Sequence, residues 1–257
     1  MSAHAAVRGA DAAALRDRAT LLEIRGVGKR FGGLQALQDV SFTVGAGEIL
    51  GLIGPNGAGK TTLFSTLVGL HRADAGSIRL RGRDLVGLKP HRIARLGLTK
   101  TFQNVALFMD TDVLDNVVIG GLLHRPLRAA RAQALDCLAR VGLADIATKR
   151  AGDLSFPERA RVEVARALAT EPTLLLLDEV MAALNALEMA EMMELIRSLR
   201  ADGLTVVVVE HHMKAIMALC DRIVALSFGR LLAVGTPAEI VRHPDVVTAY
   251  LGRPYAG

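Results

Sequence analysis

The sequence predicts an α/β fold with a parallel β-sheet, and three patterns support this prediction. Two apolar runs, Thr173–Glu179 and Thr205–His211, are typical of buried parallel strands, and residues 187–203 between them have helical spacing. A strand, a helix and a second strand in this order place the two strands parallel. A third apolar run, Ile49–Ile53, ends at a glycine-rich loop that leads into another helical pattern. The 257 residues suffice for one large α/β domain or two small ones.

The pattern along the chain also divides it into regions. We expect residues 1–20, which are rich in alanine but interrupted by Asp and Arg, to form a flexible N-terminal tail, and residues 21–253 to form the folded domain. Residues from about 105 to 165 are mostly helical in pattern, which predicts a helical subdomain inserted into the α/β body. The other expected elements are short strands over 21–53, a helix over 60–69, antiparallel strands over 76–88, a β pair over 223–234 and a helix over 237–243.

Composition excludes several classes of function. Aromatic residues make up only 4% of the chain, which argues against a protein that stacks nucleic-acid bases, so we expect no nucleic acid as a partner. The net charge of +5 comes from scattered basic residues and fits a solvated surface. The two cysteines lie far apart, which argues against a disulfide framework or a zinc site and fits a reducing compartment. No apolar run approaches the ~18 residues of a membrane span.

The glycine-rich loop after Ile53 is the strongest functional motif. Gly54–Thr62 matches the pattern G-x-x-x-x-G-K-[ST] in full, with a strand before it and a helix after it. In such a P-loop, backbone N–H groups surround a phosphate, and the positive end of the helix dipole faces it. We therefore expect ATP and Mg²⁺ as ligands, with a lysine on the β- and γ-phosphates and a threonine hydroxyl on the metal. The expected contacts are Gly54, Pro55, Asn56, Gly57, Ala58, Gly59, Lys60, Thr61 and Thr62 for ATP, and Thr61 for Mg²⁺.

Two carboxylates at the end of a buried strand complete the expected phosphate chemistry. Asp178 ends the run of four leucines, so its side chain should emerge at the carboxyl edge of the sheet, where it can hold Mg²⁺. Glu179 follows and is placed to orient or deprotonate the attacking water. The pair could also cap the next helix, and the two roles are compatible.

With these motifs in place, the chain from about Leu21 to Leu251 resembles the ATP-binding cassette (ABC) ATPases. The resemblance implies that Phe31 stacks on adenine and that Gln103 contacts Mg²⁺ and links to a membrane partner. It also implies that Leu154 and Ser155 begin the signature segment, where Ser155 contacts ATP, and that His211 reaches the γ-phosphate. Two such domains would sandwich two ATP molecules, with each P-loop facing the signature of the other chain. Residues 183–185 resemble the loop that follows the catalytic glutamate in this family.

Longer segments are similar to the ATPases of branched-chain (hydrophobic) amino acid importers, above all to the longer of that system's two ATPases. They are KRFGGLQALQDVSF, PHRIARLGLTKTFQN, EHHMKAIMALCDRIVALSFGR and GTPAEIVRHPDVVTAYLG. The resemblance implies two permease subunits, a second ATPase subunit in a heterodimer (with a homodimer as the alternative) and a periplasmic substrate-binding protein. It implies a peripheral position on the cytoplasmic face of the bacterial inner membrane.

One departure from the family affects mechanism. The signature reads Leu154-Ser155-Phe156-Pro157-Glu158, so Pro157 stands where the family has its second glycine. Proline has no N–H to donate to the partner's γ-phosphate. A charge-assisted hydrogen bond is worth about 1.5–3 kcal/mol, so its loss could slow the paired site about ten- to a hundredfold. A heterodimer would then have one strong and one weak site, and a homodimer two weakened sites. As a helix start the segment is regular, with Ser155 as N-cap and Glu158 completing a capping box.

The remaining departures are milder, and two alternatives stay open. Val180 replaces the usual proline, Ala183 and Ala186 replace a common glycine and proline, and His212 follows His211 where Asp is usual. Pro157 favours a nucleotide-gated module that hydrolyses ATP weakly, whereas the retained Glu179 and His211 favour an active ATPase. An ATPase of lipopolysaccharide export is a further alternative, because its C-terminal tail is similar, although TFQN and FGG speak against it.

Overall fold

A six-stranded, mostly parallel sheet forms the centre of the molecule. The structure is a computed structural model, and it describes residues 18–101 and 107–251. The strand order is β10-β9-β3-β8-β7-β6, and all neighbours pair in parallel except β10 with β9, which are antiparallel. The bounds are β3 Ile49–Ile53, β6 Leu98–Lys100, β7 Leu174–Asp178, β8 Thr205–Val209, β9 Arg222–Ser227 and β10 Arg230–Gly235.

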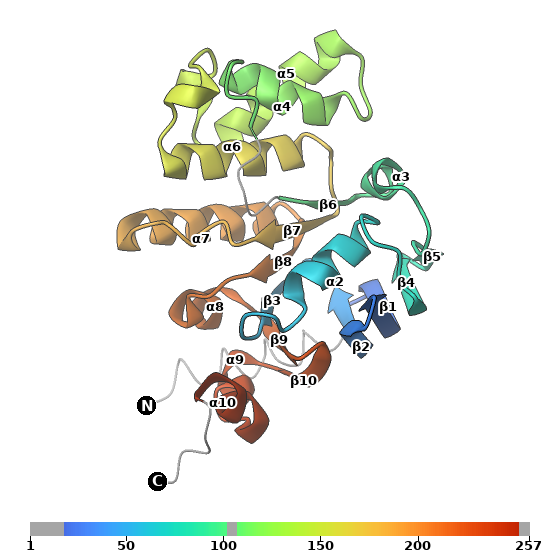
Figure 1. Ribbon diagram of the computed structural model, residues 1–257. Helices are drawn as coiled ribbons and strands as arrows, with labels where there is room; N and C mark the ends of the chain where they lie inside the picture. Colours follow the sequence, from blue (N-terminus) through green and yellow to red (C-terminus); the bar gives the residue numbers. More distant parts are fainter. Residues whose placement is uncertain (1–17, 102–106, 252–257) are drawn as a thin grey trace.

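A second, antiparallel sheet packs beside the central one (Figure 1). Its strand order is β2-β1-β4-β5. The strands are β1 Thr20–Phe31, β2 Leu34–Gly45, β4 Ala75–Leu80 and β5 Arg83–Asp84. The helix α2 (Lys60–Leu67) lies between the two sheets and shares an apolar core with them.

A helical subdomain forms the far end of the molecule, at the top of Figure 1. It consists of α4, α5 and α6, which contact one another, and two 3-10 turns, η1 and η2. The remaining helices cover the central sheet or connect its strands. The bounds are α3 Pro90–Arg95, α4 Val113–Gly121, α5 Leu127–Arg140, η1 Ala144–Ile146, η2 Ala151–Asp153, α6 Phe156–Leu168, α7 Ala186–Ala201, α8 Met213–Leu219, α9 Pro237–Ile240 and α10 Pro244–Leu251.

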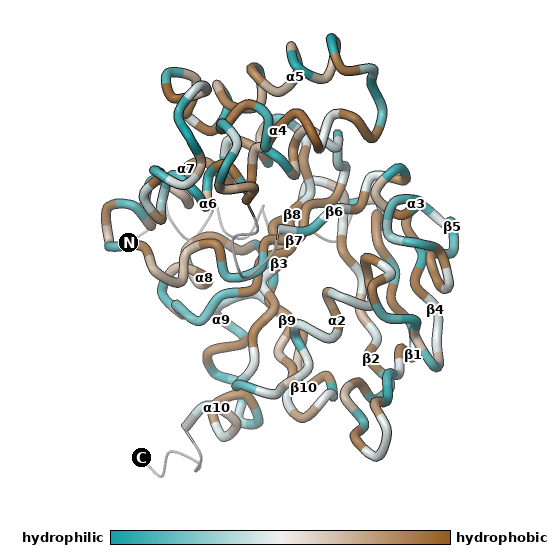
Figure 2. Tube along the Cα trace, turned by 45° about the horizontal axis from the view of Figure 1, so that its top comes forward, coloured by the Kyte–Doolittle hydropathy of each residue, from teal (hydrophilic) through white to brown (hydrophobic). Residues whose placement is uncertain are grey.

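The central strands are apolar along their whole length because both of their faces are covered. Val206 and Val208 of β8 face the core shared with the helical subdomain and α7, whereas Val207 and Val209 face the core shared with α2 and the antiparallel sheet. Figure 2 shows this brown, hydrophobic centre between more hydrophilic outer helices. This two-sided burial explains why these strands lack the polar alternation of a half-exposed strand.

The structure confirms the α/β fold, the parallel core, the antiparallel strands and the helical segment. Sequence reasoning missed β6, α3, α8 and α10, because each is too short to establish a period. The predicted tail covers residues 1–20, of which residues 1–17 lie outside the described residues, whereas Thr20 begins β1. Arg18 is described, and its guanidinium donates a hydrogen bond to Asp221 Oδ2 at 3.0 Å. In the described part of the chain, no helix is both long and apolar enough to cross a membrane.

Candidate active site

The P-loop lines a pocket at the carboxyl end of β3. The pocket has a volume of about 850 Å³. Gly59, with φ of 100°, is the N-cap of α2, and its left-handed backbone turns the chain from the loop into the helix. The N-terminus of α2 therefore faces the pocket, which is the arrangement that binds anions. The lining residues are Leu34, Gln35, Ala36, Gln38, Asn56, Gly57, Ala58, Gly59, Lys60, Thr61, Thr62, Glu179, His211 and Phe228.

Lys60 lies at the floor of the pocket, and its side chain bends back over the P-loop. Its ammonium donates hydrogen bonds to the carbonyl oxygens of Gly54, at 2.7 Å, and Pro55, at 3.3 Å. Burial lowers the pKa of Lys60, and the carboxylates of Glu179 and Asp178 oppose this shift. The lysine thus supplies a fixed positive charge next to the backbone N–H groups of the loop.

Asp178 is almost completely buried at the end of β7. Its Oδ2 lies 3.3 Å from the ammonium of Lys100, the last residue of β6, which pairs in parallel with β7. Its Oδ1 is buried without a hydrogen-bond partner among the described residues. Burial raises the pKa of Asp178, and Lys100 opposes this rise. An unsatisfied buried carboxylate oxygen is a suitable ligand for a hard cation such as Mg²⁺.

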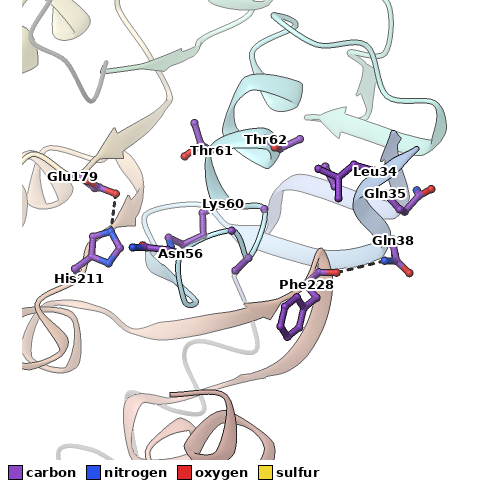
Figure 3. A pocket seen from close by; sticks show the side chains of 14 residues that line it. Leu34, Gln35, Gln38, Asn56, Lys60, Thr61, Thr62, Glu179, His211 and Phe228 are labelled. Atoms are coloured by element: carbon purple, nitrogen blue, oxygen red, sulfur yellow. Dashed lines mark hydrogen bonds and ion pairs between the residues drawn. The ribbon is translucent and has the colours of Figure 1, made fainter. Parts of the chain in front are cut away.

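Glu179 and His211 form a hydrogen-bonded pair at one side of the pocket (Figure 3). Glu179 Oε1 lies 2.8 Å from His211 Nε2, and because a carboxylate can only accept, the Nε2 atom carries the hydrogen. Glu179 has φ of 55°, a left-handed conformation that costs a non-glycine residue about 1–3 kcal/mol. The extended β7–β8 pairing holds it there, since its N–H donates to Val209 O at 3.0 Å. Such strain is typical of residues held for a chemical role.

A second carboxylate, Glu210, directly precedes His211 in the chain and is only 2% exposed. Its Oε1 accepts a hydrogen bond from the N–H of Met181 at 2.6 Å, whereas Oε2 has no hydrogen-bond partner among the described residues. Burial raises the pKa of Glu210 to about 7. Glu210 thus joins the strand that carries His211 to the loop that follows Glu179.

The structure brings together some of the predicted site residues but not all of them. Asn56, Lys60, Thr61, Thr62, Glu179 and His211 share one pocket, and Gly57, Ala58 and Gly59 line it. Three more residues lie next to the pocket. The carbonyl oxygens of Gly54 and Pro55 accept hydrogen bonds from Lys60, and Asp178 directly precedes Glu179. Gln103 lies outside the described residues. Phe31 is not among the residues that line the pocket, and its ring packs edge-on against His71 with centroids 5.0 Å apart.

The predicted signature residue Ser155 lies on the N-terminus of α6, outside the pocket. Its hydroxyl donates to Glu158 Oε2 at 2.8 Å and accepts from Glu158 N at 3.5 Å, and the carboxylate also accepts from Ser155 N at 2.6 Å. This arrangement confirms the predicted capping box, with Pro157 in the first turn of the helix. Whether Ser155 contacts ATP across a dimer stays a prediction, because that contact requires a second chain.

Sequence reasoning missed Lys100, Glu210, Gln38 and Phe228. Glu210 follows an apolar strand and directly precedes His211, so inspection of charged residues beside apolar strands could have found it, whereas only the register of β6 against β7 places Lys100 beside Asp178. Gln38 and Phe228 are 190 residues apart and meet through a side-chain hydrogen bond of 3.5 Å. No local pattern indicates that contact.

The site can hold a polyphosphate and activate water beside it. Backbone N–H groups, the α2 N-terminus and Lys60 supply positive charge, and Glu179 supplies a carboxylate base whose orientation His211 fixes. Phosphoryl transfer depends mainly on positioning and on charge stabilisation. The arrangement therefore suits hydrolysis of a nucleoside triphosphate.

Comparisons with protein families agree with this chemistry. A family model described as "ABC transporter" matches residues 37–182, more than half of the chain. A second model, "Branched-chain amino acid ATP-binding cassette transporter", matches residues 230–256.

Individual relatives match over nearly the whole chain. LivG of Salmonella typhimurium, a high-affinity branched-chain amino acid transport ATP-binding protein, is 43% identical over 249 residues, which cover 90% of this chain and 98% of LivG. The lipopolysaccharide export system ATP-binding protein LptB of Acidithiobacillus ferridurans is 39% identical over 234 residues, which cover 90% of this chain and 97% of LptB. A crystal structure of an ABC transporter cassette in its ADP conformation superposes with a TM-score of 0.84 and 27% identity, covering 91% of this chain and 100% of the other.

Proposed function

This chain belongs to the ATP-binding cassette transporter family, and on that premise we propose that it is the ATP-hydrolysing subunit of an importer for branched-chain or related amino acids. The observation that carries the proposal is the 43% identity to LivG over 249 residues. The match of residues 230–256 to the branched-chain transporter model adds to it, because this segment lies outside residues 37–182, which the general ABC transporter model matches.

The residues of the pocket divide the work of hydrolysis. The P-loop and Lys60 bind the β- and γ-phosphates, and Glu179 orients or deprotonates the water that attacks the γ-phosphate in line. His211 holds the Glu179 carboxylate through the 2.8 Å hydrogen bond and, from the same pocket, would stabilise charge on the γ-phosphate. Most of the catalysis then comes from positioned charge.

Mg²⁺ fits the residues at this site. Thr61 offers a hydroxyl from the first turn of α2, and Asp178 offers its unsatisfied Oδ1. The ion would supply additional positive charge to the phosphates when bound. Gln103, expected as a further ligand, lies outside the described residues, and its role stays a prediction.

We further propose the partners of an importer of this kind. The chain would act at the cytoplasmic face of the bacterial inner membrane with two permease subunits, a second ATPase subunit and a periplasmic substrate-binding protein. A heterodimer of ATPases fits the resemblance to one member of a two-ATPase system, and a homodimer is the alternative.

A second candidate, a nucleotide-gated module with weak hydrolysis, is favoured by Pro157. In the first turn of α6, this residue has no N–H to donate to a partner's phosphate, and the Ser155 hydroxyl donates its hydrogen bond to Glu158. The identity of 39% to LptB keeps lipopolysaccharide export as a third candidate. The branched-chain model at the C-terminus favours amino-acid import.

Purification of the complex from its native membrane tests the assignment. We expect the chain to bring with it two permeases, a second ATPase and, on addition, a periplasmic protein that binds amino acids. Recovery without any permease would refute the transporter assignment, and recovery with lipopolysaccharide-export subunits would favour the third candidate.

A further inference from the structure

We propose that Phe228, in the turn between β9 and β10, contacts the purine base of the bound nucleotide. The proposal rests on the proposed ATP binding and adds a base-recognition residue that no sequence motif indicated. Three observations carry it: the turn is fixed to the P-loop, the backbone of Phe228 is held in an unusual conformation, and its side chain is exposed at the pocket.

The turn that carries Phe228 is fixed by hydrogen bonds to the P-loop and to β2. The N–H of Gly229 donates to the carbonyl of Ala58, a P-loop residue, at 3.0 Å. The N–H of Gln38 donates to Gly229 O at 2.7 Å, and its side-chain Nε2 donates to Phe228 O at 3.5 Å. Arg230 Nε donates to Gln38 Oε1 at 2.9 Å and fixes the amide. A displacement of the turn would therefore displace the phosphate loop.

Close packing explains the sequence of the turn. Gly229 has φ of 75°, and a Cβ atom at this position would lie 2.5 Å from Ala36 O, so no other residue fits without movement. Phe228 itself has φ of 47°, which is rare for a large aromatic residue and costs free energy. The hydrogen bonds of the turn thus hold Phe228 in a strained backbone conformation with its aromatic ring exposed.

Phe228 lines the pocket, and its side chain is exposed and not packed in the core. Phe228 is 83% exposed, and Leu34, which lines the same pocket, is 68% exposed. Figure 3 shows Glu179 and His211 on one side of Lys60, and Leu34, Gln35, Gln38 and Phe228 on the other. Because the first pair belongs at the γ-phosphate, the second group lies toward the ribose and base. Apolar surface at that end suits a purine, which gains from aromatic contact.

A fluorescence experiment on the full-length chain tests the contact directly. The protein contains no Trp, so Phe228→Trp introduces a single indole at the proposed position. We expect ATP to change its emission and tripolyphosphate, which has no base, to leave it unchanged. The control Leu127→Trp, on the distant α5, should respond to neither ligand. An indole at position 228 that ignores bound ATP would contradict the proposal.

Affinity measurements separate base contact from a structural role. We expect Phe228→Ala to weaken ATP binding about five- to 150-fold, the usual range for loss of one base stack, and Phe228→Tyr to bind like wild type. Tripolyphosphate should bind equally to all three. Equal losses for ATP and tripolyphosphate would mean that Phe228 only supports the P-loop, and no loss for either would exclude the contact. Wild-type chain that fails to bind ATP would overturn the proposed function and this contact with it.

Discussion

The ion pair between Lys100 and Asp178 places two charges where water is almost absent, since the side chains are 7% and 1% exposed. Removing one partner of such a pair leaves a buried charge without compensation, which commonly costs about 3–5 kcal/mol. We expect Lys100→Met to lower the free energy of unfolding in urea by about 3 kcal/mol in the absence of nucleotide and Mg²⁺.

An exposed ion pair supplies the control for this prediction. Arg131 and Asp115 are about half exposed, so Arg131→Met should change stability much less. Equal losses for both variants would show that Lys100 does not compensate Asp178.

Glu210 predicts a dependence of stability on pH. Burial raises its pKa in the folded state to about 7, above the usual value of 4.5, so the folded protein binds this proton more tightly than the unfolded chain. The contribution of this proton to the free energy of unfolding is fully present below pH 4.5 and is lost as the pH rises through 7. The loss amounts to about 3–4 kcal/mol at pH 8, from the free energy of about 1.4 kcal/mol per pKa unit.

A neutral isostere removes this dependence. Glu210→Gln keeps an oxygen to accept the hydrogen bond from Met181, and it should match wild type near pH 4 and be more stable by about 3 kcal/mol at pH 8. Urea unfolding at the two pH values measures the difference. Parallel pH profiles for wild type and variant would show that Glu210 does not titrate in this range.

At the scale of elements, the N-terminus of α6 is well capped as a helix start but offers few hydrogen-bond donors to the ATP of a partner chain. The capping box of Ser155 and Glu158 satisfies the first turn, and Pro157 fits there because its missing N–H would be unpaired anyway. The same features remove two donors from the segment that should face a partner's ATP. Stability of the helix and catalysis at the dimer interface therefore place opposite demands on these residues.

Replacement of the proline should restore hydrolysis. The test uses a chain that carries Glu179→Gln, so that the ATP site formed by its own P-loop does not hydrolyse ATP. In this background we expect Pro157→Gly to raise ATP turnover by the complex about ten- to a hundredfold, because one charge-assisted hydrogen bond returns. The remaining activity then reports the site formed by the partner's P-loop and this chain's signature.

A matched proline elsewhere tests for a nonspecific effect. Pro237 occupies the first turn of α9, after the capping box of Thr236 and Glu239, and lies outside the dimer contact proposed for α6. Pro237→Gly in the same background should leave turnover unchanged. Unchanged turnover in the Pro157→Gly variant would remove the case for unequal ATP sites.

Local motifs predicted much of the fold and of the site, because their chemistry depends on neighbours in sequence. The P-loop, Asp178 and Glu179 each follow an apolar strand, and a strand end is visible in the sequence. Lys100 could not be found in this way, since only the register of β6 against β7 brings it beside Asp178. Phe228 depends on contacts with Gln38 and Ala58, which are distant along the chain.

At the scale of the whole molecule, the topology gathers the chemistry at one edge of the central sheet. The parallel strands β3, β7 and β8 all end there, so the P-loop, Asp178, Glu179 and His211 converge although they span more than half of the chain. The helical subdomain carries the signature segment away from this edge, beyond the reach of the chain's own pocket. The proposed head-to-tail dimer supplies what a single chain lacks.

Coupled turnover of the reconstituted complex tests the central claim most directly. The complex, with its permeases and second ATPase, would be placed in liposomes with ATP, Mg²⁺, the periplasmic binding protein and a branched-chain amino acid. We expect the amino acid to stimulate ATP hydrolysis and uptake, and Glu179→Gln to reduce hydrolysis about ten- to a hundredfold, to the rate of the weaker site, through loss of the carboxylate that activates water. Hydrolysis by the wild-type complex no faster than by the Glu179→Gln complex would contradict the account.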